Sequence, residues 1–187
     1  MKIACLDWGQ AISNEKFDPY VLGWRIDGPH LPIEYCRIED SGEVIPVMCI
    51  NAMPKKVAWS LLKIDDIDSA CKVLRDCHKI SPTRFNGIGS MIVSLGDNGS
   101  IGEWCIEKEV DAVVWIALPP RCDHIEGKLA TLEQILAHLE NTTKEARKLT
   151  RKIMKCSSNS ITTAYSQAIT QKLDEIDGSL DCATAIF

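Results

Sequence analysis

The sequence predicts an α+β fold in which strands fill most of the first two-thirds of the chain and helices form a C-terminal layer. Two observations support this prediction. Short apolar runs with strand-like alternation occur before residue 120, whereas apolar residues at helical spacing dominate the remainder. The chain has 187 residues, of which 45% are hydrophobic, so one domain with a sizeable core is expected. We expect this domain over residues 1–177 and a loose tail over 178–187.

The predicted strands lie where apolar runs are bounded by turn residues. They cover residues 2–8, 33–38, 44–50, 57–62, 91–95 and 112–118. Short links join the strands at 33–38, 44–50 and 57–62, which predicts an antiparallel meander. The stretch 112–118 is apolar throughout, which is typical of a central strand buried on both faces, and 91–95 is expected at an edge.

Helices are predicted by apolar residues at intervals of three and four. The first helix carries such a stripe at Ile67, Ala70, Cys71, Leu74 and His78. Capping boxes are predicted at the start of three later helices, at Ser100-x-x-Glu103, Thr131-x-x-Gln134 and Thr142-x-x-Glu145. A last helix from about residue 162 aligns Tyr165, Ile169, Leu173 and Ile176. Each stripe marks the apolar face of its helix.

Charge and cysteine content restrict the class of protein. Lys and Arg number 21 and Asp and Glu number 26, so the formal charge is −5 and nucleic acid is not an expected partner. No apolar run approaches the roughly 18 residues that cross a membrane, and no membrane partner is expected. The nine cysteines form no Cys-x-x-Cys pair, which disfavours a zinc site. We interpret them as reduced, mostly buried thiols of a cytoplasmic protein.

The turn after the first strand is the first candidate for a functional site. Here Asp7, Trp8, Gly9, Gln10 and Ala11 are expected to bind a ligand. A glycine at a strand end lets backbone N–H groups approach an anion closely, and Trp8 would form a pocket wall. An ordinary strand-to-loop turn is the alternative interpretation.

Two titratable residues are candidates for acid–base chemistry. Glu34 shares its strand face with Cys36, and a carboxylate on a core-facing surface is costly unless it is hydrogen-bonded, which is often so at functional sites. That face could also meet solvent. His78 ends the apolar stripe of the first helix and could act as a general acid or base. Alternatively, it is a structural histidine that the helix dipole stabilises.

The basic segment 144–155 is the last candidate taken from the residues alone. Its basic residues are Lys144, Arg147, Lys148, Arg151, Lys152 and Lys155, against the single acid Glu145. A phosphate-bearing ligand or an acidic partner would fit this charge. The alternative is a solvated helix face opposite Ala146, Leu149 and Ile153.

An ordered series of motifs resembles a known group of proteins. The series is Ala4-Cys5-Leu6-Asp7-Trp8-Gly9, then Asp27-Gly28-Pro29-x-Leu31-Pro32-Ile33-Glu34, then Leu74-Arg75-Asp76 and Asp111-Ala112-Val113-Val114-Trp115-Ile116-Ala117-Leu118-Pro119-Pro120. It resembles bacterial proteins that are similar to the gamma-glutamylcyclotransferase superfamily. The resemblance covers most of the chain, from the first predicted strand into the last predicted helix.

The resemblance implies a strongly curved, mostly antiparallel mixed barrel flanked by helices, with a ligand pocket at its mouth and no cofactor. In that superfamily a Tyr-Gly-Ser-Leu loop holds the gamma-glutamyl group through its backbone. A Glu acts as general base while the substrate cyclises to 5-oxoproline. By position the loop corresponds to residues 8–11, where Gln10 and Ala11 replace Ser and Leu. The base falls near His78, where His78 and Lys79 replace Glu and Gly.

Three functions from different classes remain open. The first is a small-molecule-binding protein on this scaffold that is catalytically silent and holds a polar or phosphate-bearing metabolite in the pocket, with Trp115 in its ligand-binding set. The second is a divergent cyclotransferase-like enzyme acting on a gamma-glutamyl amine or amide, with Glu34 or His78 as its acid–base group. The third is a protein-interaction module with a protein partner. Binding is favoured, because the departures fall on the residues expected to react.

Overall fold

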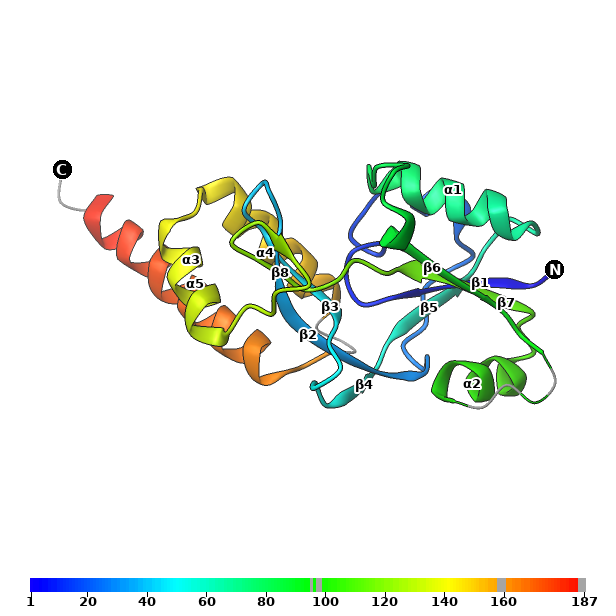
Figure 1. The fold of residues 1–187 in the computed structure, drawn as a ribbon. Helices are drawn as coiled ribbons and strands as arrows, with labels where there is room; N and C mark the ends of the chain where they lie inside the picture. The colour runs from blue at the N-terminus through cyan, green and yellow to red at the C-terminus, as the bar shows by residue number, and fades with distance from the viewer. Residues whose placement is uncertain (95, 97–98, 158–160, 185–187) are drawn as a thin grey trace.

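The structure is a computed structural model that describes residues 1–94, 96, 99–157 and 161–184 of the chain. It contains two sheets, each with its own helices (Figure 1). The first sheet comprises β1 (Ile3–Asp7), β5 (Ala58–Leu61), β6 (Ile88–Ile92) and β7 (Ala112–Ile116). Its strand order is β5-β1-β7-β6, with β1 parallel to β7 and the outer strands antiparallel to their neighbours. α1 (Ile67–Cys77) covers one face and α2 (Ser100–Lys108) the other.

The second sheet curls around the long strand β2 (His30–Ile38) into a half-barrel. Its other strands are β3 (Val44–Met48), β4 (Pro54–Lys56), β8 (Arg121–Cys122) and β9 (Ile125–Glu126). β4 pairs with the first residues of β2, and β8 pairs with its last residues. A register shift between Tyr35 and Arg37 interrupts the pairing of β2 with β3, and such bulges bend a strand.

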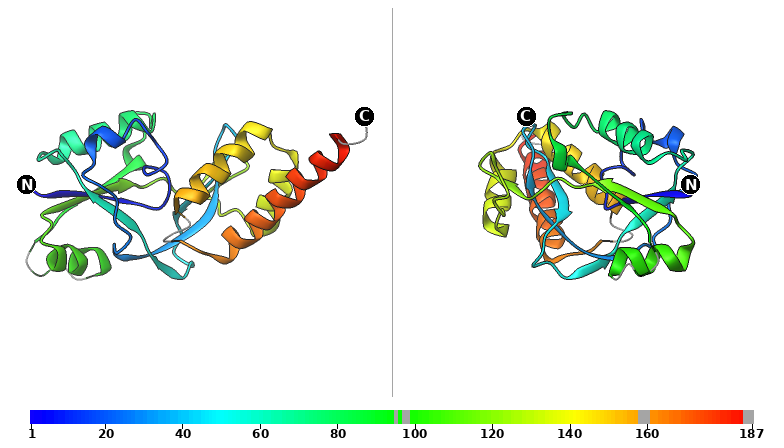
Figure 2. Two further views of the ribbon diagram at one scale, coloured as in Figure 1. Left: turned by 180° about the vertical axis from the view of Figure 1, so that it is seen from behind. Right: turned by 45° about the vertical axis from the view of Figure 1, so that its right-hand side comes forward.

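Three helices pack against β2 and β3 (Figure 2). They are α3 (Leu132–Asn141), α4 (Lys144–Ser157) and α5 (Ala164–Thr184). Two short 3-10 helices, η1 (Asp18–Tyr20) and η2 (Phe85–Gly87), lie in the connections of the first sheet. α5 continues as a helix beyond residue 177, where the sequence predicted a loose tail. Residues 185–187 of that predicted tail lie outside the described residues.

The sheets confirm the predicted α+β class and correct its strand pairing. β7 lies between β1 and β6 and is almost fully buried, as expected for a central strand, and β6 lies at an edge. β2 and β3 pair antiparallel as predicted. The third strand of the expected meander, β5, instead pairs with β1 in the other sheet. The short strand β4 was missed, and it takes the place beside β2. Local spacing therefore identified the longer strands, but neither the short strands β4, β8 and β9 nor all the strand partners.

Of the three predicted capping boxes, the one at the start of α3 is present and the other two predictions are wrong. Thr131 and Gln134 make both reciprocal hydrogen bonds at the start of α3. α2 has no side-chain cap, because Gly99 rather than Ser100 stands at its N-cap. α4 begins at Lys144, and the side chain that caps it is Thr143, whose hydroxyl accepts from the N–H of Ala146 at 3.1 Å. Thr142 instead ends α3.

The described cysteines are thiols, as the composition predicts. All eight cysteines whose side chains are described are free, and most of them are buried. Burial raises the pKa of Cys36 and Cys5 well above that of an ordinary thiol. Within the described residues, no helix has both the length and the apolar character needed to cross a membrane.

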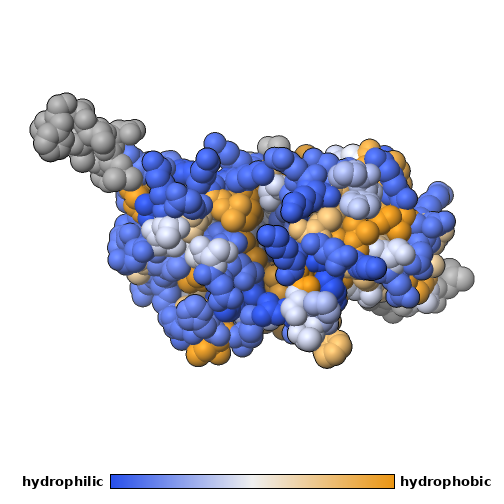
Figure 3. Space-filling view, turned by 90° about the horizontal axis from the view of Figure 1, so that it is seen from above, coloured by the Kyte–Doolittle hydropathy of each residue, from blue (hydrophilic) through white to orange (hydrophobic). Residues whose placement is uncertain are grey.

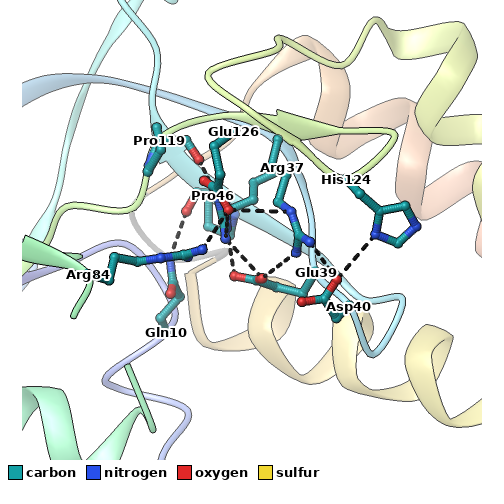
Figure 4. A network of polar contacts seen from close by, with 10 residues as sticks. Gln10, Arg37, Glu39, Asp40, Pro46, Arg84, Pro119, His124 and Glu126 are labelled. Carbon is teal, nitrogen blue, oxygen red and sulfur yellow. Dashed lines mark hydrogen bonds and ion pairs between the residues drawn. The ribbon is translucent and has the colours of Figure 1, made fainter. Parts of the chain in front are cut away.

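A network of charges joins the two sheets (Figure 4). The guanidinium of Arg37, on β2, is fully buried and donates to Glu39 at 2.6 Å, to Glu126 at 2.7 Å and to the carbonyl of Pro119 at 2.8 Å. Arg84, which precedes η2, donates to the same Glu126 carboxylate at 2.8 Å. β2 and β9 belong to the half-barrel, whereas Arg84 and Pro119 border strands of the first sheet.

We predict that replacing Arg37 destabilises the protein strongly. Arg37→Gln leaves two carboxylates without their buried partner, and breaking a buried pair in this way costs about 3–5 kcal/mol. Urea denaturation measures the effect. The control is Lys172→Gln, which removes a pair with Glu140 at 2.6 Å between the outer faces of α3 and α5 and should change stability little. Equal losses in the two variants would contradict the buried network.

Candidate functional site

The candidate site is a cleft of about 810 Å³ between the first sheet and the half-barrel. Four segments form its walls: the loop after β1, the turn between β2 and β3, the segment that follows α1, and the face of α4 around residues 149–153. Segments beside both sheets therefore line one cavity, and its size suits a small molecule. The face drawn in Figure 3 is mostly hydrophilic, with separate apolar patches.

Charged residues of both signs line this cleft. The basic residues are Lys16, Lys79, Arg84 and Lys152, and the acidic residues are Glu15, Glu39, Asp40 and Glu43. Most of the acids already have partners: Glu39 pairs with Arg37, Asp40 with Arg121 and Glu15 with Lys152. The Lys152 pair is long, at 3.5 Å, and both side chains are well exposed. An exposed pair of this kind is weak and can open for a ligand.

His78 lines the cleft and follows the last residue of α1 as its C-cap. Its backbone N–H donates to the carbonyl of Leu74 at 3.2 Å, and its ring meets that of Phe17 edge-on. The Nε2 atom is buried and has no hydrogen-bond partner in the described part of the chain. Burial lowers the pKa of His78, and the charge of Asp7 opposes this shift. The ring is therefore neutral at neutral pH, which leaves one nitrogen able to accept a proton.

The turn after β1 is held by hydrogen bonds between its own residues. The buried carboxylate of Asp7 accepts from the backbone N–H groups of Gly9 at 2.9 Å, Ala11 at 2.8 Å and Ile12 at 3.0 Å. Trp8 is buried in the core. Of the five predicted ligand-binding residues of this turn, Gln10 lines the cleft, and its amide donates to the carbonyl of Pro46 at 2.9 Å.

Gly9 has a positive φ of 123°, and a Cβ at this position would lie 3.0 Å from the Cβ of Ser157 on α4. The glycine therefore lets the turn pack closely on α4. Its own N–H, like that of Ala11, is bonded to Asp7. The backbone donors that the sequence assigned to a ligand anion are thus used inside the protein.

Glu34 and Trp115 lie away from this cleft. Glu34 accepts from the N–H of Tyr35 at 2.8 Å and from the hydroxyl of Thr163, just before α5 begins. Burial raises the pKa of Glu34, and these hydrogen bonds reduce the shift. Trp115 lies on β7 beside Gly89 of β6. The structure therefore does not bring Glu34 and His78 into one site.

Sequence reasoning missed two residues of the cleft. Glu43 follows the Ser41-Gly42 turn, where a carboxylate resembles any solvated turn residue, yet its Oε2 atom is buried without a described hydrogen-bond partner. Asn14 donates to the carbonyl of Cys77 at 2.9 Å and so ties the turn after β1 to the end of α1, beside His78. No sequence signal marks either role, because both depend on contacts between distant segments.

The basic segment 144–155 is divided between structural contacts and the cleft. Arg147 donates to the carbonyls of Leu139 and Thr142, and Arg151 pairs with Asp174 of α5 at 2.7 Å. Lys152 is the basic residue of α4 that lines the cleft. Arg147 and Arg151 therefore contact the protein itself rather than form a purely solvated face, and ligand binding by this segment stays a prediction.

In the described ranges, no group of His, Cys, Asp and Glu side chains is arranged to hold a metal ion. Comparisons with protein families, with curated proteins and with solved structures find no match for this chain. The site is therefore interpreted from its own geometry.

We predict that His78 makes the protein less stable in mild acid. Its folded pKa lies below the ordinary value of 6.5, so the unfolded chain binds more protons as the pH falls through 6.5. Stability from this residue is present above pH 6.5 and is lost toward lower pH. His78→Gln should lose less stability than the wild type between pH 7.5 and 5.5, as measured by urea denaturation. The exposed His30→Gln variant should follow the wild type, and equal pH slopes for all three proteins would count against a buried, neutral His78.

Proposed function

We propose that this protein binds a small phosphate-bearing metabolite in the cleft between its two sheets. The observation that carries the proposal is the position of Lys16, Lys79 and Lys152, which line one cavity from three different elements. Lysine is a common phosphate ligand, because it offers a compact positive charge and three donors. The resemblance to cyclotransferase-like proteins, which have a pocket at the mouth of a curved barrel, supports the same location.

The remaining charges around the cleft favour an anion over a cation at the lysines. Arg84 is held by Glu126, and Glu39 and Asp40 are held by Arg37 and Arg121. These pairs neutralise one another, and the other charged side chains of the described cleft wall are the three lysines, Glu15 and Glu43. The exposed Lys152 needs only to leave its 3.5 Å pair with Glu15 to reach a ligand. The chain as a whole is acidic, so a small anion fits this local charge better than a nucleic acid does.

We predict that Lys152→Ala weakens binding of a phosphate monoester about tenfold, because a charge-assisted hydrogen bond is lost. Isothermal titration calorimetry with a panel of small phosphate monoesters measures the dissociation constants, and thermal unfolding confirms that ligand raises the melting temperature. The control is Lys148→Ala on the same helix, since Lys148 does not line the cleft. Equal binding by the two variants, or no binding by the wild type, would reject a phosphate site at these lysines.

His78 favours a second candidate function. A buried, neutral imidazole on the cleft wall has the properties of a general base, and the resemblance places the catalytic base near this residue. In a cyclotransferase-like reaction this base would assist attack of the substrate amine on its side-chain carbonyl. Positioning and one proton acceptor suffice for an intramolecular step of this kind.

The second candidate predicts that a gamma-glutamyl dipeptide is converted to 5-oxoproline, which mass spectrometry detects. His78→Gln should then lower the rate about 100-fold or more, as loss of a general base does. Glu34→Gln should keep the activity of the wild type, because Glu34 lies on β2, hydrogen-bonded to Thr163 and outside the cleft. If the wild-type protein binds ligand but forms no 5-oxoproline, the cyclotransferase-like function is rejected and the binding function is retained.

A further inference from the structure

Glu43 differs from the other acidic residues of the cleft. Its backbone is fixed, because its carbonyl accepts from the N–H of Glu39 at 3.0 Å and the N–H of the next residue, Val44, donates to the hydroxyl of Thr150 at 3.0 Å. Its side chain lines the cleft, and the Oε2 atom is buried with no hydrogen-bond partner in the part of the chain that the structure describes. A buried carboxylate oxygen without a donor is costly, so this atom calls for a partner.

The neighbouring side chains do not supply that partner. Glu39 and Asp40, in the same turn, take the guanidinium groups of Arg37 and Arg121. Arg84 donates to Glu126 on the far side of the network. A ligand donor can satisfy Glu43, and a positively charged nitrogen satisfies a carboxylate best. His78, the other cleft residue with a buried unpaired atom, is neutral and does not repel such a group.

We infer that Glu43 is a specificity residue that selects ligands carrying a primary amine as well as a phosphate. This inference rests on the proposed function, because it assumes that the lysines of the cleft hold the phosphate. The ligand is then an aminoalkyl phosphate or a larger amine-bearing phosphate monoester. Its ammonium group donates to Glu43 and its phosphate accepts from Lys16, Lys79 and Lys152. The cleft, at about 810 Å³, has room for both ends.

Two ligands of the same shape test this inference. In phosphoethanolamine an ammonium group occupies the place of the terminal methyl group of propyl phosphate, so the two differ chiefly in the charge that Glu43 would recognise. Calorimetry with the wild-type protein should show phosphoethanolamine binding about tenfold more tightly. Glu43→Gln keeps the size of the side chain and should bind both ligands with nearly equal affinity. Glu145→Gln removes an exposed acid of α4 that does not line the cleft and should keep the wild-type preference.

The outcomes separate the two proposals. Equal binding of both ligands by the wild type overturns the role of Glu43 and leaves the phosphate site standing. A preference that survives in Glu43→Gln overturns it as well, since another residue would then recognise the amine. Absence of binding by either ligand rejects the phosphate site together with the inference. Circular dichroism of each variant shows that a change in preference comes from a folded protein.

Discussion

The buried guanidinium of Arg37 is the interaction on which the arrangement of this protein depends. A charge removed from water is stable only when carboxylates and carbonyls surround it with good geometry. Here those groups come from β9, from the end of β2 and from the segment after β7. Because the segment after β7 leaves the first sheet and β9 belongs to the half-barrel, one ion-pair network fixes how the two sheets meet. The cleft lies beside this junction, and Glu39, Asp40 and Arg84 belong to both.

The turn after β1 also contains a buried charged group, Asp7, and satisfies it with backbone hydrogen bonds instead of ion pairs. Asp7 is buried and accepts three backbone hydrogen bonds from its own turn, which gives a carboxylate the partners it needs without a counter-ion. This fixes the turn, and Gly9 lets it approach α4. As a result, α4 bridges the sheets: it contacts the turn of the first sheet, packs on β3 of the second and contributes Lys152 to the cleft between them.

The sequence could predict what depends on neighbouring residues. The apolar stretch of β7, the stripe of α1 and the reciprocal bonds of Thr131 and Gln134 all follow from local spacing, and all three are present. Pairing of β5 with β1 rather than β3 could not be predicted, because it depends on which sheet edge is available. Glu43 could not be found either. Its burial arises where the β2–β3 turn meets segments far along the chain.

The motifs that carry the resemblance illustrate the same limit. Asp27 accepts from the indole of Trp59 at 2.7 Å and from Lys108 at 2.9 Å, and these bonds lower its pKa. Asp7 and Glu34 likewise accept hydrogen bonds within the protein. Each of these carboxylates stands in a motif that suggests chemistry, yet each has partners that explain it as part of the scaffold.

Whether a buried polar group has a hydrogen-bond partner is therefore a better guide to its role in this protein than whether it stands in a sequence motif. A buried polar atom that is already paired contributes to folding, whereas one without a partner carries a cost that only a ligand, a water molecule or a proton can relieve. On the walls of the cleft, the side-chain atoms with this property are Nε2 of His78 and Oε2 of Glu43 among the described residues. His78 ends α1 beside the first sheet and Glu43 precedes β3 of the half-barrel, so a molecule that satisfied both would be held at the junction that Arg37 stabilises.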